Sequence, residues 1–184
     1  MKALVSNGKN DLNLLDLPEP VCGPDDLIIK TQQIGVCGTD LEIIHNKMDP
    51  EYIRYPATIG HEWTGKVIEI GSNVKGFDIG QRVVVEGLIP CQKCHECAIG
   101  ATNRCLTYDE IGFTRPGGGS EKVLIPARMA HKVNENVTVE SAQLAEPTCV
   151  VMNAYTKADL APGRKILIIG DGTIGLIAAT LAKT

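Results

Sequence analysis

The chain has 184 residues, of which 43% are hydrophobic and 22% charged, with a formal net charge of -4; this composition is typical of an ordinary soluble globular protein. Its basic residues are scattered, which excludes an obvious surface for nucleic acid. The first ten residues lack the layout of a signal peptide, and no apolar run approaches the roughly 20 residues that a membrane crossing needs. We therefore expect a cytoplasmic protein without a membrane partner.

The first part of the chain predicts a β-rich domain. Five short apolar runs indicate strands: Leu12–Leu15, Leu27–Ile29, Val67–Ile70, Arg82–Val85 and Val123–Ile125. Turn residues separate several of them, at Cys22–Asp25, Gly71–Asn73 and Asp78–Gly80. Glycine and asparagine tolerate positive φ and proline fixes a negative φ, so these segments favour reversals of the chain.

The pattern changes after Pro147. The predicted elements there are a helix over Thr148–Leu160, a stop at Ala161–Gly163, a doubly buried strand over Lys165–Ile169, a G-x-G-x-x-G motif of Gly170, Gly172 and Gly175, and a helix over Leu176–Lys183. A strand that leads through such glycines into a helix lets backbone amides face a pyrophosphate. The order predicts the beginning of a doubly wound α/β domain, although a tight turn without a ligand is the alternative.

Four of the seven cysteines form a C-x2-C-x2-C-x7-C pattern, and they are Cys91, Cys94, Cys97 and Cys105. Four thiolates at short spacing can surround one Zn²⁺ tetrahedrally, and a closed shell leaves no position for chemistry. We therefore predict a structural zinc site, with free or redox-active thiols as the alternative. His95 lies inside the pattern, but four thiolates already fill the zinc shell, so we expect His95 to be a solvated loop histidine.

Other potential ligands lie apart from this pattern: Cys37, the adjacent pair His61 and Glu62, and Glu146. One sulfur, one imidazole and one carboxylate make an open zinc site that can polarise a substrate oxygen. From residue types alone, the alternative is the usual role of such residues: a small buried cysteine and a satisfied or solvated His–Glu pair.

Five motifs occur in one order: G-x-C-G-T-D, G-H-E, the four cysteines, E-P and G-x-G-x-x-G. Over its whole length the chain resembles the zinc-dependent branch of the medium-chain dehydrogenase/reductase family. The resemblance implies a β-rich α+β fold, with a GroES-like catalytic domain over residues 1–150. Residues 151–184 would then be a connecting helix and the start of a truncated Rossmann domain for NAD or NADP.

The resemblance also implies roles for single residues. Cys37 and His61 match ligands of a catalytic zinc, and Glu62 matches the carboxylate that completes or exchanges on the metal. Glu146 stands where sorbitol-like members have a glutamate, which favours a polyol substrate. Thr39 matches the hydroxyl that passes the substrate proton outward.

The chain departs from the family pattern at the proton relay, where Glu42 replaces a frequent histidine. His45 is nearby, and an exposed loop histidine is the simpler interpretation. The glycine-rich stretch Ile111–Ser120 is similar to threonine and sugar dehydrogenases, which suggests a hydroxyl-bearing substrate. Glycine runs also serve as plain turns, so both readings stay open.

The resemblance predicts hydride transfer between a polyol, sugar or amino-alcohol hydroxyl and NAD(P). It also predicts that the full-length protein forms a homo-oligomer. An acidic ribose-binding residue would follow the glycines by roughly 20 positions, beyond this chain, so NAD and NADP are not distinguished. We expect the chain alone to be inactive, with its tail anchored on the barrel, paired with another chain or loosely held. A non-catalytic zinc-stabilised binding module is the alternative, whereas a zinc-free reductase is disfavoured by Cys37, His61 and the four cysteines.

Overall fold

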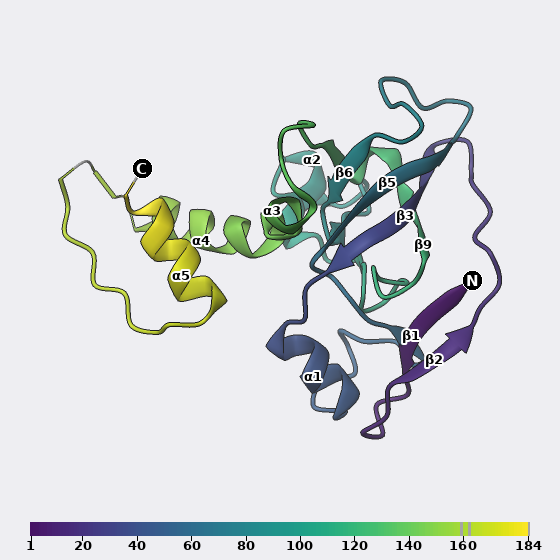
Figure 1. Cartoon of the computed structure of the whole chain (residues 1–184), viewed down its shortest axis with the longest axis horizontal. Helices are drawn as coiled ribbons and strands as arrows, with labels where there is room; N and C mark the ends of the chain where they lie inside the picture. The colour runs from purple at the N-terminus through teal and green to yellow at the C-terminus, as the bar shows by residue number, and fades with distance from the viewer. Residues whose placement is uncertain (159, 162, 184) are drawn as a thin grey trace.

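The strands gather at one end of the molecule, and α4 and α5 lie at the other (Figure 1). The computed structural model describes residues 1–158, 160–161 and 163–183. The strands are β1 (Lys2–Ser6), β2 (Asn13–Asp16), β3 (Asp26–Ile34), β4 (Ala57–Thr58), β5 (Trp63–Ile70), β6 (Arg82–Val85), β7 (Leu88–Ile89), β8 (Asp109–Glu110), β9 (Lys122–Pro126) and β10 (Ala130–Lys132). The helices are α1 (Gly38–Ile44), α2 (His95–Ala98), α3 (Val139–Gln143), α4 (Ala145–Lys157) and α5 (Thr173–Leu181), with short 3-10 turns at Thr102–Arg104 and Ala127–Met129.

The largest sheet has the strand order β10-β6-β5-β3-β9, and all its pairs are antiparallel. Its buried side holds branched aliphatic side chains, including Leu27, Ile29, Val67, Val83 and Val123. Burying one such side chain contributes about 1.5–3 kcal/mol relative to leaving it exposed. The predicted runs Leu27–Ile29, Val67–Ile70, Arg82–Val85 and Val123–Ile125 all lie within strands of this sheet, which confirms the β-rich prediction.

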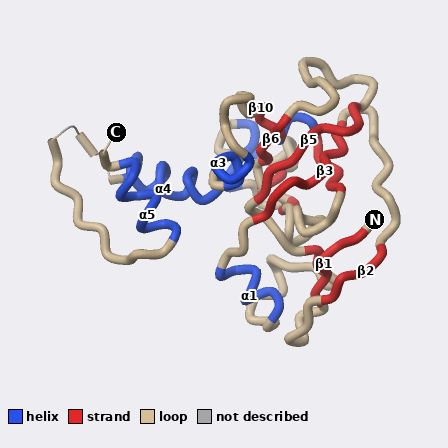
Figure 2. The backbone as a smooth tube through the Cα atoms, in the orientation of Figure 1, coloured by secondary structure: helices blue, strands red, loops and turns tan. Residues whose placement is uncertain are grey.

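A smaller sheet, β2-β1-β4, lies beside α1 (Figure 2). A second core cluster joins Ile43 of α1 to Ile59 and Phe113. Helix α1 was not among the predicted elements, because its seven residues are too few to show a helical period. The predicted run Leu12–Leu15 overlaps β2, whose side chains are exposed.

The end of the chain differs from its prediction in where its two helices begin and in one strand. Helix α4 begins at Ala145, before the predicted Thr148, and it places Pro147 in its first turn, where a missing N–H costs little. The predicted strand over Lys165–Ile169 is wrong: the segment forms no strand, and Leu167 and Ile169 are 84% and 89% exposed. No described strand lies beside it to accept its backbone hydrogen bonds, and a lone strand is not stable.

Helices α4 and α5 pack against each other, with the Tyr155 hydroxyl donating to the Ala178 carbonyl oxygen at 2.6 Å. Helix α5 agrees with the predicted Leu176–Lys183 helix but begins earlier, at Thr173. Pro162, part of the predicted helix stop, lies outside the described residues. Within the described part of the chain, no helix combines the length and the apolar character that spanning a membrane requires.

Candidate functional site

The four clustered cysteines converge on one point. The sulfur atoms of Cys91, Cys94, Cys97 and Cys105 lie within 4.8 Å of one another, and none forms a disulfide. Cys94 is the N-cap residue of α2 and Cys97 lies within α2, so this short helix and its cap position two of the four sulfurs. The backbone N–H of Cys91 donates to the Cys105 sulfur at 3.2 Å, which orients the thiol. We call these residues the lobe; His95 is exposed and not part of the set.

The thiols of the lobe differ in acidity. Hydrogen bonds from Thr107 and the backbone lower the pKa of Cys91 to about 5. Burial and the neighbouring thiols raise the pKa of Cys97 to about 12. Negative charges so close together oppose further ionisation unless a cation lies between them. A tetrahedral set of four sulfurs is the donor chemistry that zinc prefers, so these residues fit a structural zinc ion.

A second set of possible ligands forms from two distant segments. Ligand atoms of Cys37, His61 and Glu62 lie within 4.8 Å of one another, and we call this group the open set. Cys37 precedes α1, and His61 and Glu62 precede β5. The Gly35 N–H donates to the Glu62 carbonyl oxygen at 2.7 Å, which holds the two segments side by side.

The buried side chain of Asp40 contacts both chain segments of the open set. Its side chain is 1% exposed and accepts hydrogen bonds from the backbone N–H groups of Cys37 at 2.9 Å and Gly60 at 3.3 Å. Its Oδ1 atom also lies 3.5 Å from Nδ1 of His61. One buried carboxylate therefore fixes both chain segments and leaves the other imidazole nitrogen available as a ligand, an arrangement common around metal-binding histidines.

The surroundings of His61 favour a positive charge. Burial opposes protonation of the imidazole, but the Asp40 carboxylate and the Cys37 thiol outweigh burial and raise the pKa of His61 to about 9. The contact of Nδ1 with Asp40 at 3.5 Å is an ion pair rather than a hydrogen bond, and the buried Nδ1 makes no hydrogen bond with the described atoms. The imidazole ring lies 5.2 Å from the ring of Phe113. The set offers one sulfur, one imidazole and one carboxylate next to this negative charge. These donors fit a zinc ion that keeps one coordination position free for another molecule.

Two further carboxylates lie near the open set. Glu146, in the first turn of α4, is half-buried and outside the group of mutually close ligand atoms. Burial and the charge of Glu62 raise its pKa. Burial likewise raises the pKa of Glu110, which interacts electrostatically with His61 and Glu146. Glu146 is thus in the neighbourhood that the sequence predicted, but Cys37, His61 and Glu62 form the tighter group.

The predicted relay residues take different positions. The Thr39 hydroxyl lies 3.7 Å from the Cys37 sulfur, so it faces the open set. His45 is exposed, and its Nδ1 lies 2.6 Å from the side-chain oxygen of Asn10. Glu42 is also exposed on α1. Of these three residues, only Thr39 lies where it could contact a molecule bound at the open set.

The glycine motif faces the open set across a cavity of about 480 Å³. One wall contains Cys37 and Glu62, and the other contains Gly170, Gly172 and Gly175. A Cβ atom on Gly172 would meet nothing within 4 Å, so this backbone is accessible from the cavity. The tail packs on α4, and its glycine motif lines the same cavity as two of the predicted ligands.

The glycine-rich stretch between β8 and β9 serves packing. The Gly118 N–H donates to the Gly60 carbonyl oxygen at 2.7 Å, and the Gly119 N–H donates to that of Ile59 at 2.9 Å. A Cβ on Gly117 would collide with these same two carbonyl groups. The stretch thus supports the chain just before His61, which favours the turn interpretation over direct substrate contact.

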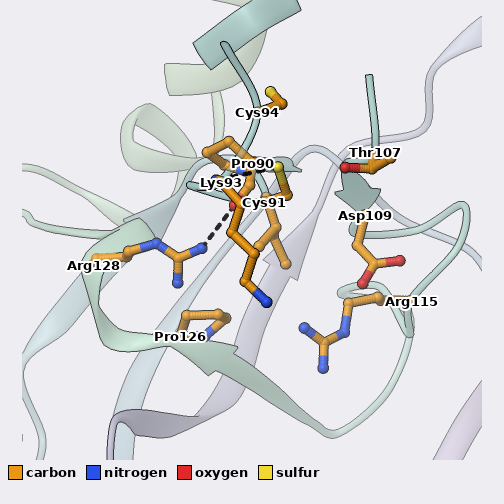
Figure 3. Close-up of a pocket in the computed structure, with 10 residues that line it drawn as sticks. Pro90, Cys91, Lys93, Cys94, Thr107, Asp109, Arg115, Pro126 and Arg128 are labelled. Carbon is orange, nitrogen blue, oxygen red and sulfur yellow. Dashed lines mark hydrogen bonds between the residues drawn. The ribbon is translucent and has the colours of Figure 1, made fainter. Parts of the chain in front are cut away.

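A second cavity, of about 680 Å³, lies beside the lobe (Figure 3). Cys91 and Cys94 line it together with the basic side chains of Lys93, Arg115 and Arg128. Arg128 donates to the Pro90 carbonyl oxygen at 3.0 Å. A zinc ion held by four thiolates would carry surplus negative charge, which basic side chains nearby would help to compensate.

The architecture agrees with what comparison with known proteins shows. The model of the alcohol dehydrogenase GroES-like domain matches residues 23–135. The chain belongs to the zinc-dependent medium-chain dehydrogenase family. It is 36% identical over its full length to L-threonine 3-dehydrogenase of Alteromonas mediterranea, covering 54% of that protein. It therefore spans about half the length of the curated relatives it matches.

Solved structures of this family superpose closely. Galactitol-1-phosphate dehydrogenase of Escherichia coli matches with a TM-score of 0.91 and 30% identity, over 100% of this chain and 52% of that one. A Sinorhizobium meliloti structure with NADP bound matches with a TM-score of 0.92 and 31% identity, over 99% of this chain and 52% of the other.

Sequence reasoning missed two residues of the site. Asp40 was recognised only as part of G-x-C-G-T-D, although an acid three residues after Cys37 is where a helix N-terminus is capped. Glu110 carried no sequence signal, because its proximity to His61 arises only from folding.

Proposed function

We propose that the chain is the metal- and substrate-binding part of a zinc-dependent dehydrogenase that acts on a polyol, sugar or amino-alcohol hydroxyl with NAD(P). The observation that carries this proposal is the cavity shared by the open set and the glycine motif. A hydroxyl held at one wall would lie opposite a nicotinamide cofactor held at the other. Named relatives act on L-threonine or galactitol-1-phosphate, so the hydroxyl chemistry is common and the rest of the substrate varies.

The proposal assigns a role to each residue around the cavity. Cys37, His61 and Glu62 would hold the catalytic zinc, with Glu146 as a second carboxylate able to complete or exchange on it. The four cysteines of the lobe would hold the structural zinc. We assign residues 1–150 to the GroES-like catalytic domain and residues 151–184 to the connecting helix and the start of the nicotinamide-binding domain.

When bound, zinc supplies a Lewis acid that makes an alcohol easier to deprotonate, and NAD(P) accepts the hydride. The protein's own residues position these events. Asp40 orients His61, and Thr39 lies at the Cys37 sulfur, where its hydroxyl can receive the substrate proton and pass it outward. Gly170, Gly172 and Gly175 present backbone to a pyrophosphate at the start of α5.

Elemental analysis of metal content tests the proposal. We expect two zinc ions per chain in the wild type and one in Cys37→Ser, because only the open set loses a ligand. Cys22→Ser is the matched control, since Cys22 is a half-buried thiol outside both clusters, and it should keep two. Two zinc ions in Cys37→Ser would refute the catalytic assignment, and one in the wild type would favour a zinc-stabilised binding module.

A further inference from the structure

Three cationic side chains from separate segments line the cavity of about 680 Å³ beside the lobe. Lys93 lies in the lobe, Arg115 in the loop between β8 and β9, and Arg128 in the short turn after β9. In the view of Figure 3, the Lys93 ammonium group lies between the two guanidinium groups. Three like charges repel one another, so an anion bound among them would lower the electrostatic energy.

The fold fixes the backbone at the first two of these cations. The Lys93 N–H donates to the Cys91 sulfur at 3.4 Å, which ties Lys93 to the lobe. The Arg115 N–H donates to the Glu110 carbonyl oxygen at 2.9 Å and helps to close the tight loop after β8. The two side chains therefore start from ordered positions on different segments, as in a preformed site.

Most donors of the three cations have no partner in the protein. Within the described part of the chain, the side chains of Lys93 and Arg115 make no hydrogen bond and no ion pair. Arg128 donates from one nitrogen to the Pro90 carbonyl oxygen at 3.0 Å. A guanidinium group carries five N–H donors in a planar fork that matches two oxygens of one anion. The cavity therefore offers a set of donors that the protein does not use.

The negative groups at the cavity have other partners. Asp109 is the one acidic residue among the described lining residues, and its Oδ1 atom lies 3.6 Å from the guanidinium of Arg54 and accepts from the Thr114 hydroxyl at 3.1 Å. The sulfur atoms of Cys91 and Cys105 accept backbone N–H groups. No lysine or arginine side chain of the described chain donates to a sulfur of the lobe. The lobe thus attracts the cations through space but leaves their N–H groups without an acceptor.

The size and surface of the cavity indicate the class of ligand. Its volume lies in the range of small-molecule sites, and Ile89 and Pro126 add apolar surface to its lining. Three cations favour a doubly charged group over a singly charged one, because the Coulomb attraction grows with the charge. We propose that this cavity binds the phosphate group of a small molecule through Lys93, Arg115 and Arg128. It shares none of its described lining residues with the cavity at the open set, so the inference does not depend on the proposed catalytic function.

Phosphorus-31 NMR of the zinc-loaded chain, with inorganic phosphate as the probe, tests this inference. We expect saturable binding to the wild type, with acetate competing at least about 10-fold more weakly. Lys93→Gln and Arg115→Gln should each weaken phosphate binding about 10- to 100-fold, the range of one charged hydrogen bond. Lys47→Gln removes an exposed charge outside the cavity and should bind phosphate as the wild type does.

Cys37→Ser distinguishes this cavity from the open set, where a zinc ion can also bind phosphate, and it should leave the binding unchanged. Loss of binding in Cys37→Ser, or unchanged binding in Lys93→Gln and Arg115→Gln, would overturn the inference. A wild type that does not bind phosphate, or that binds acetate as tightly, would do the same. If Arg115→Gln does not fold, Lys93→Gln decides alone, because Lys93 is exposed and its side chain makes no hydrogen bond within the described chain. None of these outcomes bears on the metal content expected of the open set.

Discussion

The lobe takes all its sulfurs from the short segment between Cys91 and Cys105, whereas the open set joins Cys37 to His61 and Glu62 across α1 and β4. A local set can close around a metal with little help from the rest of the fold, and it leaves no free position. A distant set depends on the tertiary structure to bring its members together, and it keeps a side open to a cavity. The difference predicts that metal stabilises the protein chiefly at the lobe and supplies chemistry chiefly at the open set.

The largest effect on stability is expected from Cys94→Ser. Loss of a structural metal belongs to the changes that cost about 4 kcal/mol or more, which would lower the Tm by roughly 8–16 °C in a chain of this size. Thermal unfolding followed by circular dichroism measures this, with Cys149→Ser, an exposed thiol on α4, as the control. A Tm unchanged from the wild type would contradict the structural role.

Asp40→Asn should have the next largest effect on stability, and it should also weaken metal binding at the open set. The buried carboxylate accepts two backbone hydrogen bonds, and the loss of its charge should cost about 1.5–3 kcal/mol. Metal affinity at the open set should fall about 10- to 100-fold, as for other groups that orient a ligand histidine. Competition with a chelator measures the affinity, and Asp16→Asn, an exposed acid paired with Lys2, is the control. Weaker metal binding at the lobe instead would show that Asp40 does not act through the open set.

Tyr155→Phe tests the helical end of the molecule alone. It removes the hydrogen bond to Ala178 and should weaken the contact of α4 with α5 by about 1 kcal/mol. Amide hydrogen exchange should quicken in α5 while the central strands β3 and β5 keep their protection. Tyr52→Phe, at an exposed ring between α1 and β4, should change neither region. Faster exchange in β3 and β5 as well would show that the helical end and the central sheet unfold as one unit.

The smallest effect on stability is expected from Cys37→Ser. Cys37 is half-buried and precedes α1 without belonging to either core cluster, so the free energy of unfolding should change by about 0.5 kcal/mol or less. Urea unfolding measures this change against the wild type. A loss as large as that of Cys94→Ser would mean that the open set also holds the fold together, and the contrast between the two sets would fail.

The sequence predicted the elements whose signals are local. Short apolar runs between turn residues located β6 at its observed bounds and placed the other central strands, because such runs with bounding turn signals indicate strands. It failed at Lys165–Ile169, where the composition suits a buried strand but the described chain provides no neighbouring strand. It also missed α1, which is recognised mainly by the cap that Asp40 provides.

For the site, the sequence by itself determined the lobe, since four cysteines at such spacing can reach one point through a short loop. It also named the residues of the open set through the resemblance to a family. Only the tertiary structure decided that Cys37, His61 and Glu62 form the tight group and that Glu146 lies outside it. It also decided that Asp40 is buried next to this group and that Glu110 interacts with His61. These relations join segments far apart in the chain, so they depend on the packing of the two cores rather than on local spacing.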